Sequence, residues 1–219
     1  MTVLKEILHS RQLRNLHIVD IGCGDGYLCE LVSKSFEDVV KVVGVDISII
    51  RLKRAKQRAP HCSFIRADIK YLPFKELFSI AIASQLIEHL QYPEVALQEV
   101  HRILLRKGFL ILDTPSQSNI IDMLLDLFGK KPTWSLRLDS GHIFFYDEES
   151  IKALLHSAGF RTLDVRGVSI LRYDLLSLLS ITWDERKWWL PRFLDSIAHR
   201  FYALRSKGAI QVFLCQSKL

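Results

Sequence analysis

Short apolar runs alternate along this sequence with stretches of helical periodicity. The run Leu16 to Ile21 ends at a glycine-rich turn, and Val39 to Ile47 is rich in the β-branched residues that favour strands. Leu77 to Ser84 is almost wholly apolar, as expected of a strand that is buried on both faces. Ile49 to Arg58 and Pro93 to Leu105 have the spacing of amphipathic helices. The alternation predicts an α/β fold, a Rossmann-like three-layer sandwich around a mostly parallel sheet.

Shorter elements complete the expected sheet and its helices. They are Tyr27 to Ser35, Cys62 to Ala67, Gly108 to Asp113, Asp147 to Ser157, Val165 to Val168 and Ile210 to Leu214. We expect a seven-stranded sheet whose last strand is antiparallel, and a length of 219 residues fits one domain over 1–219. Segments 114–145 and 169–208 are long for plain connections, so we interpret them as insertions in that domain.

Composition narrows the class of protein. The four cysteines, Cys23, Cys29, Cys62 and Cys215, form no C-x-x-C pair, so we expect reduced thiols and neither a disulfide framework nor a zinc site. The sequence contains no apolar run long enough for a transmembrane helix, and its start lacks the features of a signal peptide. We therefore expect a cytoplasmic location. A net charge of +6 is too small to indicate an acidic partner by itself.

The most specific local signal is the turn Val19-Asp20-Ile21-Gly22-Cys23-Gly24-Asp25-Gly26, between a predicted strand and a predicted helix. Glycines let the backbone bend sharply and approach a ligand closely. The start of the following helix offers free N–H groups to a carboxylate or a phosphate. A tight turn without a ligand would use the same glycines, so the turn needs support from its surroundings.

Asp46 supplies that support, at the carboxyl end of the second predicted strand and 20 residues beyond Gly26. A carboxylate there can accept both hydroxyls of an adenosine ribose, in NAD or in S-adenosylmethionine; alternatively, it caps the helix that begins near Ser48. The G-x-G-x-G spacing, with Tyr27 where the dinucleotide fingerprint has its third glycine, argues against NAD. The carboxylate of Asp20 would oppose a pyrophosphate but favour a sulfonium or an ammonium.

Several segments resemble the class I S-adenosylmethionine-dependent methyltransferases. They are VDIGCGDGYL, VVGVDIS, FIRADIKYLPF, SIAIASQLIEHL and EVHRILLRKGFLILDTPS. The chain looks like the small-molecule type and is similar to the quinone-biosynthesis methyltransferases. This resemblance implies S-adenosylmethionine as the methyl donor and S-adenosylhomocysteine as the product. The turn Arg106-Lys107-Gly108-Phe109 departs from the K-P-G-G that is usual in the family.

The resemblance also implies a cofactor site at the strand ends. Asp46 would bind the ribose, Asp68 the adenine amino group, and the backbone carbonyl of Ser84 the methionine end. Asp68 could instead begin a turn through its own side chain. The predicted cofactor-binding residues are Asp20, Gly22, Cys23, Gly24, Gly26, Asp46, Ile47, Asp68, Ile69 and Ser84.

His89 and His142 are the candidate catalytic residues, as general bases or acceptor contacts. Some relatives build a divalent metal site from E-x-x-E-H; here Gln85 stands in the first acidic position before Glu88-His89, and we predict no metal. The segment Gly141 to Tyr146 resembles one that shapes the acceptor pocket. Structural roles remain open for both histidines, His89 at a helix start and His142 in the core.

The expected acceptor is a small molecule, with a hydrophobic one compatible with the aromatic insertions. Trp183, Trp188 and Trp189 suggest a lid helix, and membrane-surface contact is the less favoured alternative. The basic residues of 51–58 have no interleaved aromatic residues, so we interpret them as a solvated helix face and expect no nucleic acid. An NAD-dependent oxidoreductase and a catalytically inactive binding module of this fold remain alternatives, and the sequence leaves the oligomeric state open.

Overall fold

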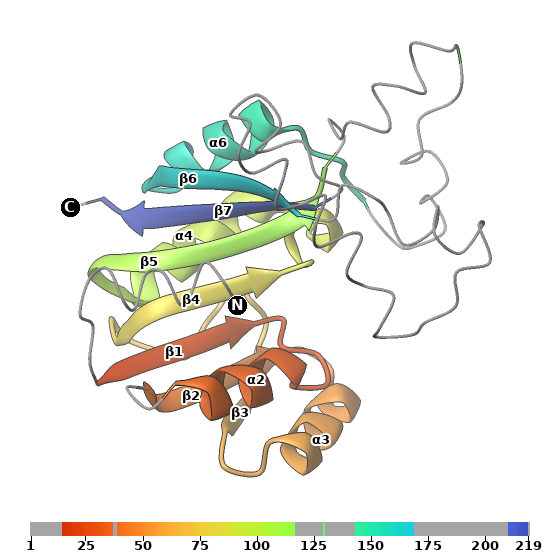
Figure 1. Ribbon diagram of the computed structural model, residues 1–219, viewed down its shortest axis with the longest axis vertical. Helices are drawn as coiled ribbons and strands as arrows, with labels where there is room; N and C mark the ends of the chain where they lie inside the picture. Colours follow the sequence, from red (N-terminus) through yellow and green to blue (C-terminus); the bar gives the residue numbers. More distant parts are fainter. Residues whose placement is uncertain (1–14, 37–38, 117–128, 130–142, 169–209, 219) are drawn as a thin grey trace.

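The structure, a computed structural model, describes residues 15–36, 39–116, 129, 143–168 and 210–218. These residues contain a seven-stranded sheet in the order β3-β2-β1-β4-β5-β7-β6 (Figure 1). Strand β7 runs antiparallel to β5 and to β6, and the other pairings are parallel. The strands are β1 (Leu16–Ile21), β2 (Val39–Asp46), β3 (Ser63–Arg66), β4 (Phe78–Ser84), β5 (Leu104–Pro115), β6 (Phe160–Val168) and β7 (Ile210–Ser217). The predicted sheet, with only its last strand reversed, is confirmed.

Helices cover both faces of the sheet (Figure 1). Helices α2 (Tyr27–Ser35) and α3 (Ile49–Arg58) pack through Val32 and Leu52 into one apolar cluster. Helices α4 (Pro93–Ile103) and α6 (Glu148–Ser157) pack through residues such as Val100 and Ile151 into a second cluster on the opposite face. A short 3-10 helix, η1 (Ile87–His89), follows β4. The three layers of the prediction are therefore present.

The central strands are buried on both faces, which explains their continuous apolar sequences. In β1, Leu16 and Ile18 face the α2–α3 layer, whereas Val19 and Ile21 face the α4–α6 layer. Neighbouring residues of β5 divide in the same way. Because consecutive strand side chains point to opposite faces, both layers can bury apolar surface against one strand. Burial stabilises such a core by about 25 cal/mol per Å² of apolar surface.

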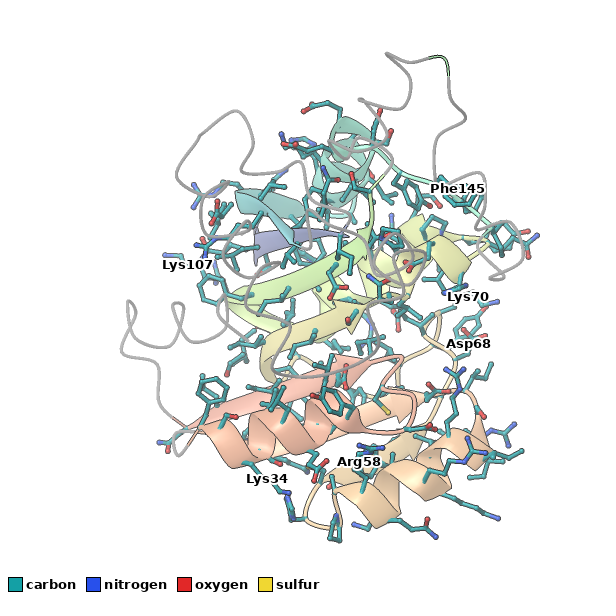
Figure 2. The ribbon with its side chains drawn as sticks, turned by 45° about the vertical axis from the view of Figure 1, so that its right-hand side comes forward. Lys34, Arg58, Asp68, Lys70, Lys107 and Phe145 are labelled. Carbon is teal, nitrogen blue, oxygen red and sulfur yellow. The ribbon has the colours of Figure 1, made fainter. Side chains whose placement is uncertain are left out.

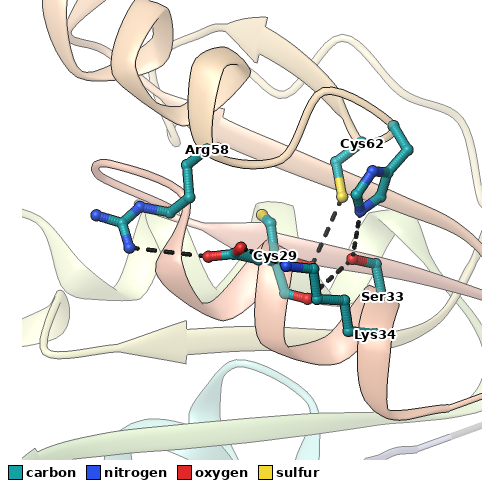
Figure 3. Close-up of polar contacts among 7 residues, drawn as sticks. Cys29, Ser33, Lys34, Arg58 and Cys62 are labelled. Atoms are coloured by element: carbon teal, nitrogen blue, oxygen red, sulfur yellow. Dashed lines mark hydrogen bonds and ion pairs between the residues drawn. The ribbon is translucent and has the colours of Figure 1, made fainter.

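A polar network fastens α2 to α3 and to the segment before β3 (Figure 3). The Cys62 thiol donates to the Cys29 carbonyl at 3.6 Å, and Ser33 Oγ lies 3.2 Å from His61 Nε2. Glu30 pairs with Lys34 at 2.7 Å and with Arg58 at 3.8 Å. The surface ion pairs add little stability individually. The buried sulfur contact fixes α2, and with it the turn that precedes the helix.

Strand β5 differs from its prediction at both ends. Helix α4 ends at Ile103, and β5 begins at once with Leu104, which pairs with Phe78 before the register shifts. Lys107 adopts a positive φ of 60° inside the resulting bulge. Sequence periodicity missed this start because two leucines continue the apolar spacing of the helix. The family's K-P-G-G turn is thus replaced by a bulged strand start.

The last two strands are longer than predicted. Strand β6 begins at Phe160, where the prediction placed its start at Val165, and β7 continues to Ser217. Polar residues alternate through β6, and Arg166 bonds Asp164 at 2.7 Å. Such alternation is typical of a strand at the edge of a sheet, where one face is less buried. The start of β6 was missed because the prediction relied on continuous apolar runs.

The predicted insertions lie mostly outside the described residues. The first was expected to begin at Thr114, but Thr114 and Pro115 still belong to β5, and Ser116 forms a bridge with Tyr146. Residues 117–128, 130–142 and 169–209 are not described, so the lid prediction, which rests on Trp183, Trp188 and Trp189, falls outside the described residues. None of the described helices has the length and apolar character needed to span a membrane.

Candidate functional site

A cavity of about 350 Å³ lies beyond the carboxyl ends of the first four strands. Strand-end residues and the loops that follow β1, β3 and β4 form its wall. The lining residues are Ile21, Gly22, Val45, Asp46, Ile47, Arg51, Ala67, Asp68, Ile69, Gln85, Leu86, His89 and Leu90. Open α/β sheets bind ligands in the crevice beyond these strand ends, and the volume is in the range of small-molecule pockets.

The glycine-rich turn lies directly against the end of β2. The backbone N–H groups of Gly22 and Cys23 both donate to the Val45 carbonyl, at 2.8 and 2.9 Å. At Gly26, φ is 78°, and an added Cβ would lie 2.8 Å from the Ala55 Cβ of α3. Only glycine combines that backbone conformation with that close approach. The predicted tight turn is therefore present, with glycine demanded by geometry at Gly26.

Asp46 fixes this turn while it lines the cavity. Its Oδ2 accepts the Gly24 N–H at 2.9 Å, and its Oδ1 accepts the Ser48 N–H at 2.8 Å. Ser48 is the N-cap of α3, and its hydroxyl accepts the Arg51 N–H. Asp46 therefore does not cap α3 itself, as the alternative interpretation expected, but holds the cap residue Ser48 and also lines the cavity. Each carboxylate oxygen has a second lone pair available for a ligand hydroxyl.

Asp68 combines the two roles that the sequence left open. Its Oδ1 accepts the Lys70 N–H at 3.0 Å, and its carbonyl accepts the Tyr71 N–H, so it begins a turn. Its Oδ2 lies 3.5 Å from Lys70 Nζ, and Figure 2 shows both side chains together on the loop after β3. Asp68 also lines the cavity with Ile47 and Ile69. This end of the cavity offers an acid between apolar side chains.

Asp20 and Cys23 lie behind the turn and do not line the cavity. The Cys29 thiol donates to Asp20 Oδ2 at 3.4 Å. Burial, opposed by the Cys29 bond and helped by the charges of Asp113 and Asp46, raises the pKa of Asp20 to about 7. The pKa of the Cys29 thiol is also raised, chiefly by its contact with Cys23 and then by burial. The two predicted residues therefore support the turn from beneath.

The other end of the cavity is formed by the residues that follow β4. Ser84 closes the strand, and Gln85 adopts a positive φ of 50°. The Gln85 backbone donates to the Asp113 carbonyl at 3.0 Å, and its Nε2 donates to Asp113 Oδ1 at 2.7 Å. Burial raises the pKa of Asp113, against the lowering effect of this bond. Gln85 and His89 line the cavity, whereas Ser84 does not.

Glu88 joins the start of η1 to the segment before α6. Its carbonyl accepts the N–H groups of Ile143 and Phe144, at 2.8 and 3.1 Å. Its Oε2 accepts the Thr114 hydroxyl at 3.1 Å, while Oε1 is buried without a hydrogen-bond partner among the described residues. Burial raises the pKa of Glu88, and burial also raises that of nearby Tyr146 to about 12. His142 itself lies outside the described residues. The two residues that follow it, Ile143 and Phe144, bond to Glu88, which precedes His89 in the chain.

The three residues at the E-x-x-E-H positions point to different partners. Gln85 bonds Asp113, Glu88 bonds Thr114 in the interior, and His89 lines the cavity. Within the described parts of the chain, no group of three or more His, Cys, Asp or Glu side chains could hold a metal ion. The absence of a metal remains a prediction.

Sequence reasoning missed several residues of the wall. Ile21, Val45 and Ala67 end or follow strands, so their place at the cavity follows from the strand ends once those are located. Leu86 and Leu90 flank the predicted His89. Arg51 was interpreted only as part of a solvated helix face. That face is exposed as predicted, yet Arg51 at its edge also lines the cavity.

Fold, strand order and cavity together define the Rossmann-like methyltransferase class. Residues 3–165 match the family model described as "Methyltransferase domain", and the chain belongs to that family. Membership implies S-adenosylmethionine as the cofactor and S-adenosylhomocysteine as its product. The resemblance seen in the sequence is therefore confirmed at the level of the class. The closer likeness to quinone-biosynthesis enzymes stays a prediction.

Individual relatives match parts of the chain or only its fold. Trans-aconitate 2-methyltransferase of Yersinia pestis strain Pestoides F is 50% identical over 52 residues, 24% of this chain and 20% of that protein. The chain thus aligns with about a fifth of the length of such curated relatives. The cyclase SpnF has a TM-score of 0.68 at 18% identity, over 100% of this chain and 81% of its own. An S-adenosylmethionine-dependent methyltransferase of Mesorhizobium loti has a TM-score of 0.65 at 16% identity, covering 98% and 96%.

The cavity residues fit S-adenosylmethionine in their chemistry. Asp46 offers acceptor lone pairs for ribose hydroxyls, and Asp68 offers one for an amino group. Ile47 and Ile69 supply apolar surface for a planar base. The turn meets the cavity wall at Gly22, which has no Cβ, whereas the predicted cofactor residues Gly24 and Gly26 do not line the cavity. These acceptor groups and apolar side chains therefore suit an adenosine that carries a short charged tail.

Proposed function

We propose that the chain transfers the methyl group of S-adenosylmethionine to a small-molecule acceptor. The observation that carries the proposal is Asp46, which lines the cavity from the end of β2 with both oxygens fixed by backbone N–H groups. A carboxylate at this strand end is suited to a ribose diol. Family membership supports the reaction type, while the acceptor is inferred from the cavity and the sequence.

The chain's residues would act mainly by positioning. Asp46 and Asp68 would orient the adenosine, so that the sulfonium faces Gln85 and His89 at the other end of the cavity. Bound S-adenosylmethionine supplies the electrophilic methyl group. Holding an acceptor in line with that methyl can lower the barrier by up to about 7–11 kcal/mol. A lone pair of the acceptor would form the new bond to the methyl carbon while the carbon–sulfur bond breaks. The electron pair of the broken bond would stay on sulfur.

His89 is the proposed general base for a hydroxyl acceptor. It lines the cavity beside Leu86 and Leu90, next to the tethered 143–144 segment. Removal of an acceptor proton during transfer would add about 10²–10⁴-fold in rate. His142 remains the second candidate for this role. A general base would be dispensable for an amine acceptor that is already neutral.

Three observations favour a small molecule in the cytoplasm. The cavity wall is largely apolar with a few polar groups, as in pockets for small ligands. The Yersinia relative is named for a small carboxylic acid, trans-aconitate. The four cysteines are buried free thiols, which suits a reducing compartment. Membrane-surface contact remains the less favoured proposal.

The proposal is tested by calorimetry with S-adenosylhomocysteine and NAD in parallel. We expect a micromolar dissociation constant for the first, about −8 kcal/mol, and no binding of the second. Incubation with labelled S-adenosylmethionine and a panel of small acceptors should then yield S-adenosylhomocysteine. Binding of NAD alone would support the oxidoreductase. Binding of S-adenosylhomocysteine without turnover on small acceptors, but with methyl transfer to RNA and binding that weakens steeply with salt, would contradict the small-molecule acceptor.

A further inference from the structure

Arg51 places a positive charge at the edge of the cavity. It lies in the first turn of α3, where its backbone N–H is held by the Ser48 hydroxyl. Its Nη1 lies 3.8 Å from the position that a Cβ on Gly24 would occupy. Among the lining residues that the structure describes, it is the one Lys or Arg. The guanidinium therefore lies beside the glycine-rich turn at Gly24, whose backbone N–H is bonded to Asp46.

Three other cations of α3 have partners among the described residues. Arg54 pairs with Asp25 at 3.7 Å, and Arg58 with Glu30 at 3.8 Å. Lys56 donates to two backbone carbonyls, at 2.6 and 3.0 Å. In the described part of the chain, the Arg51 guanidinium has no hydrogen-bond or ion-pair partner. Its donors are thus available at the place where a ligand would lie.

A ribose hydroxyl can bond both an acceptor and a donor of the protein. A hydroxyl donates one hydrogen bond and accepts others, whereas a carboxylate only accepts and a guanidinium only donates. Asp46 can satisfy the hydroxyl hydrogens but not the hydroxyl oxygens. We propose that the Arg51 guanidinium donates hydrogen bonds to the ribose oxygens of the cofactor, so that the ribose bridges Asp46 and Arg51.

This inference rests on the proposed function, because it takes the ligand to be S-adenosylmethionine or its product. It adds a residue that fixes the adenosine end and so affects binding of donor and product alike. Arg51 would act through binding, and the reacting methyl group would lie at the far end of the cavity, near Gln85. A planar fork of donors also distinguishes arginine from lysine at this position.

The test is calorimetry of S-adenosylhomocysteine binding to Arg51→Ala, Arg51→Lys and the control Lys53→Ala. Lys53 is an exposed cation of the same helix that does not line the cavity. We expect Arg51→Ala to raise the dissociation constant about tenfold or more, Arg51→Lys to raise it less, and Lys53→Ala to leave it within about twofold.

A second ligand separates the ribose contact from a general charge effect. With the 2′,3′-dideoxy analogue of S-adenosylhomocysteine, wild type and Arg51→Ala should have the same dissociation constant. An equal loss on both ligands, or wild-type affinity of Arg51→Ala for S-adenosylhomocysteine, would overturn the inference alone. Failure of the wild-type chain to bind S-adenosylhomocysteine would overturn the proposed function, and this inference with it.

Discussion

Replacing Asp46 by asparagine should weaken cofactor binding and also destabilise the fold, by amounts that the structure allows us to estimate. The carboxylate accepts two backbone N–H groups, from Gly24 at 2.9 Å and from Ser48 at 2.8 Å. An amide keeps one acceptor oxygen and places an NH₂ group where the other oxygen stood. One of these two bonds is therefore lost, because the backbone N–H that made it now faces the NH₂ group of asparagine.

The expected losses are moderate. A hydrogen bond to a charged group contributes about 1.5–3 kcal/mol, so a loss of roughly 2 kcal/mol would lower Tm by about 4–8 °C in a chain of this size. A similar loss at the ribose hydroxyls would raise the dissociation constant for S-adenosylhomocysteine about 30-fold. Asp46→Ala would remove both acceptors and is the less informative variant, because instability would obscure the binding effect.

Calorimetric titration and thermal melting measure the two effects separately. Asp25→Asn is the matched control, since Asp25 belongs to the same turn but is half-exposed and does not line the cavity. We expect its affinity to stay within about twofold of the wild type. If Asp46→Asn lowers Tm but binds S-adenosylhomocysteine as the wild type does, Asp46 only braces the turn and the ribose assignment is refuted.

Three further predictions concern stability. Asp20 has a pKa of about 7 in the fold against 3.8 as its ordinary value, so the unfolded chain loses this proton first. The free energy of unfolding should therefore fall as the pH rises between these values and level off above them. Asp20→Asn should flatten this dependence, measured by urea unfolding at a series of pH values. Parallel pH profiles of the wild type and the variant would contradict the reasoning. Gly26→Ala should cost about 2–4 kcal/mol in urea unfolding, because φ is 78° and the new Cβ would meet Ala55 at 2.8 Å. Gly129→Ala, at a φ of 65° with no described atom within 4 Å, should cost only about 1 kcal/mol, and equal losses would refute the steric argument. Thr114→Val should lower stability to thermal melting by about 1–3 kcal/mol by removing the donor to buried Glu88; an unchanged Tm would show that the bond contributes nothing.

The end of the cavity that we propose for the adenosine was the more predictable part from sequence. Asp46, Ile47, Asp68 and Ile69 end or follow strands, and apolar runs locate strand ends well. Because parallel strands end at one edge of the sheet, these residues converge without any knowledge of side-chain contacts. The glycine-rich turn adds a local backbone requirement that the sequence displays directly.

The other end of the cavity, near Gln85 and His89, depends on contacts between distant segments, and the sequence did not reveal them. Gln85 is oriented by Asp113 because β4 and β5 are neighbours, a pairing that spans 28 positions of the chain. The tether from Glu88 to Ile143 joins segments still further apart. Arg51 looked like its neighbours in a basic helix, since only the approach of α3 to the glycine-rich turn distinguishes it. The starts of β5 and β6 were missed for the local reasons of helical spacing and polar alternation.

The central claim is that the cavity beyond the first four strands binds the cofactor through Asp46. A crystal structure of the chain with S-adenosylhomocysteine tests it most directly. We predict the ribose against Asp46, the adenine between Ile47 and Ile69, and the sulfur directed towards Gln85 and His89. Density for the ligand elsewhere on the protein, or in this cavity with the ribose away from Asp46, would contradict the claim.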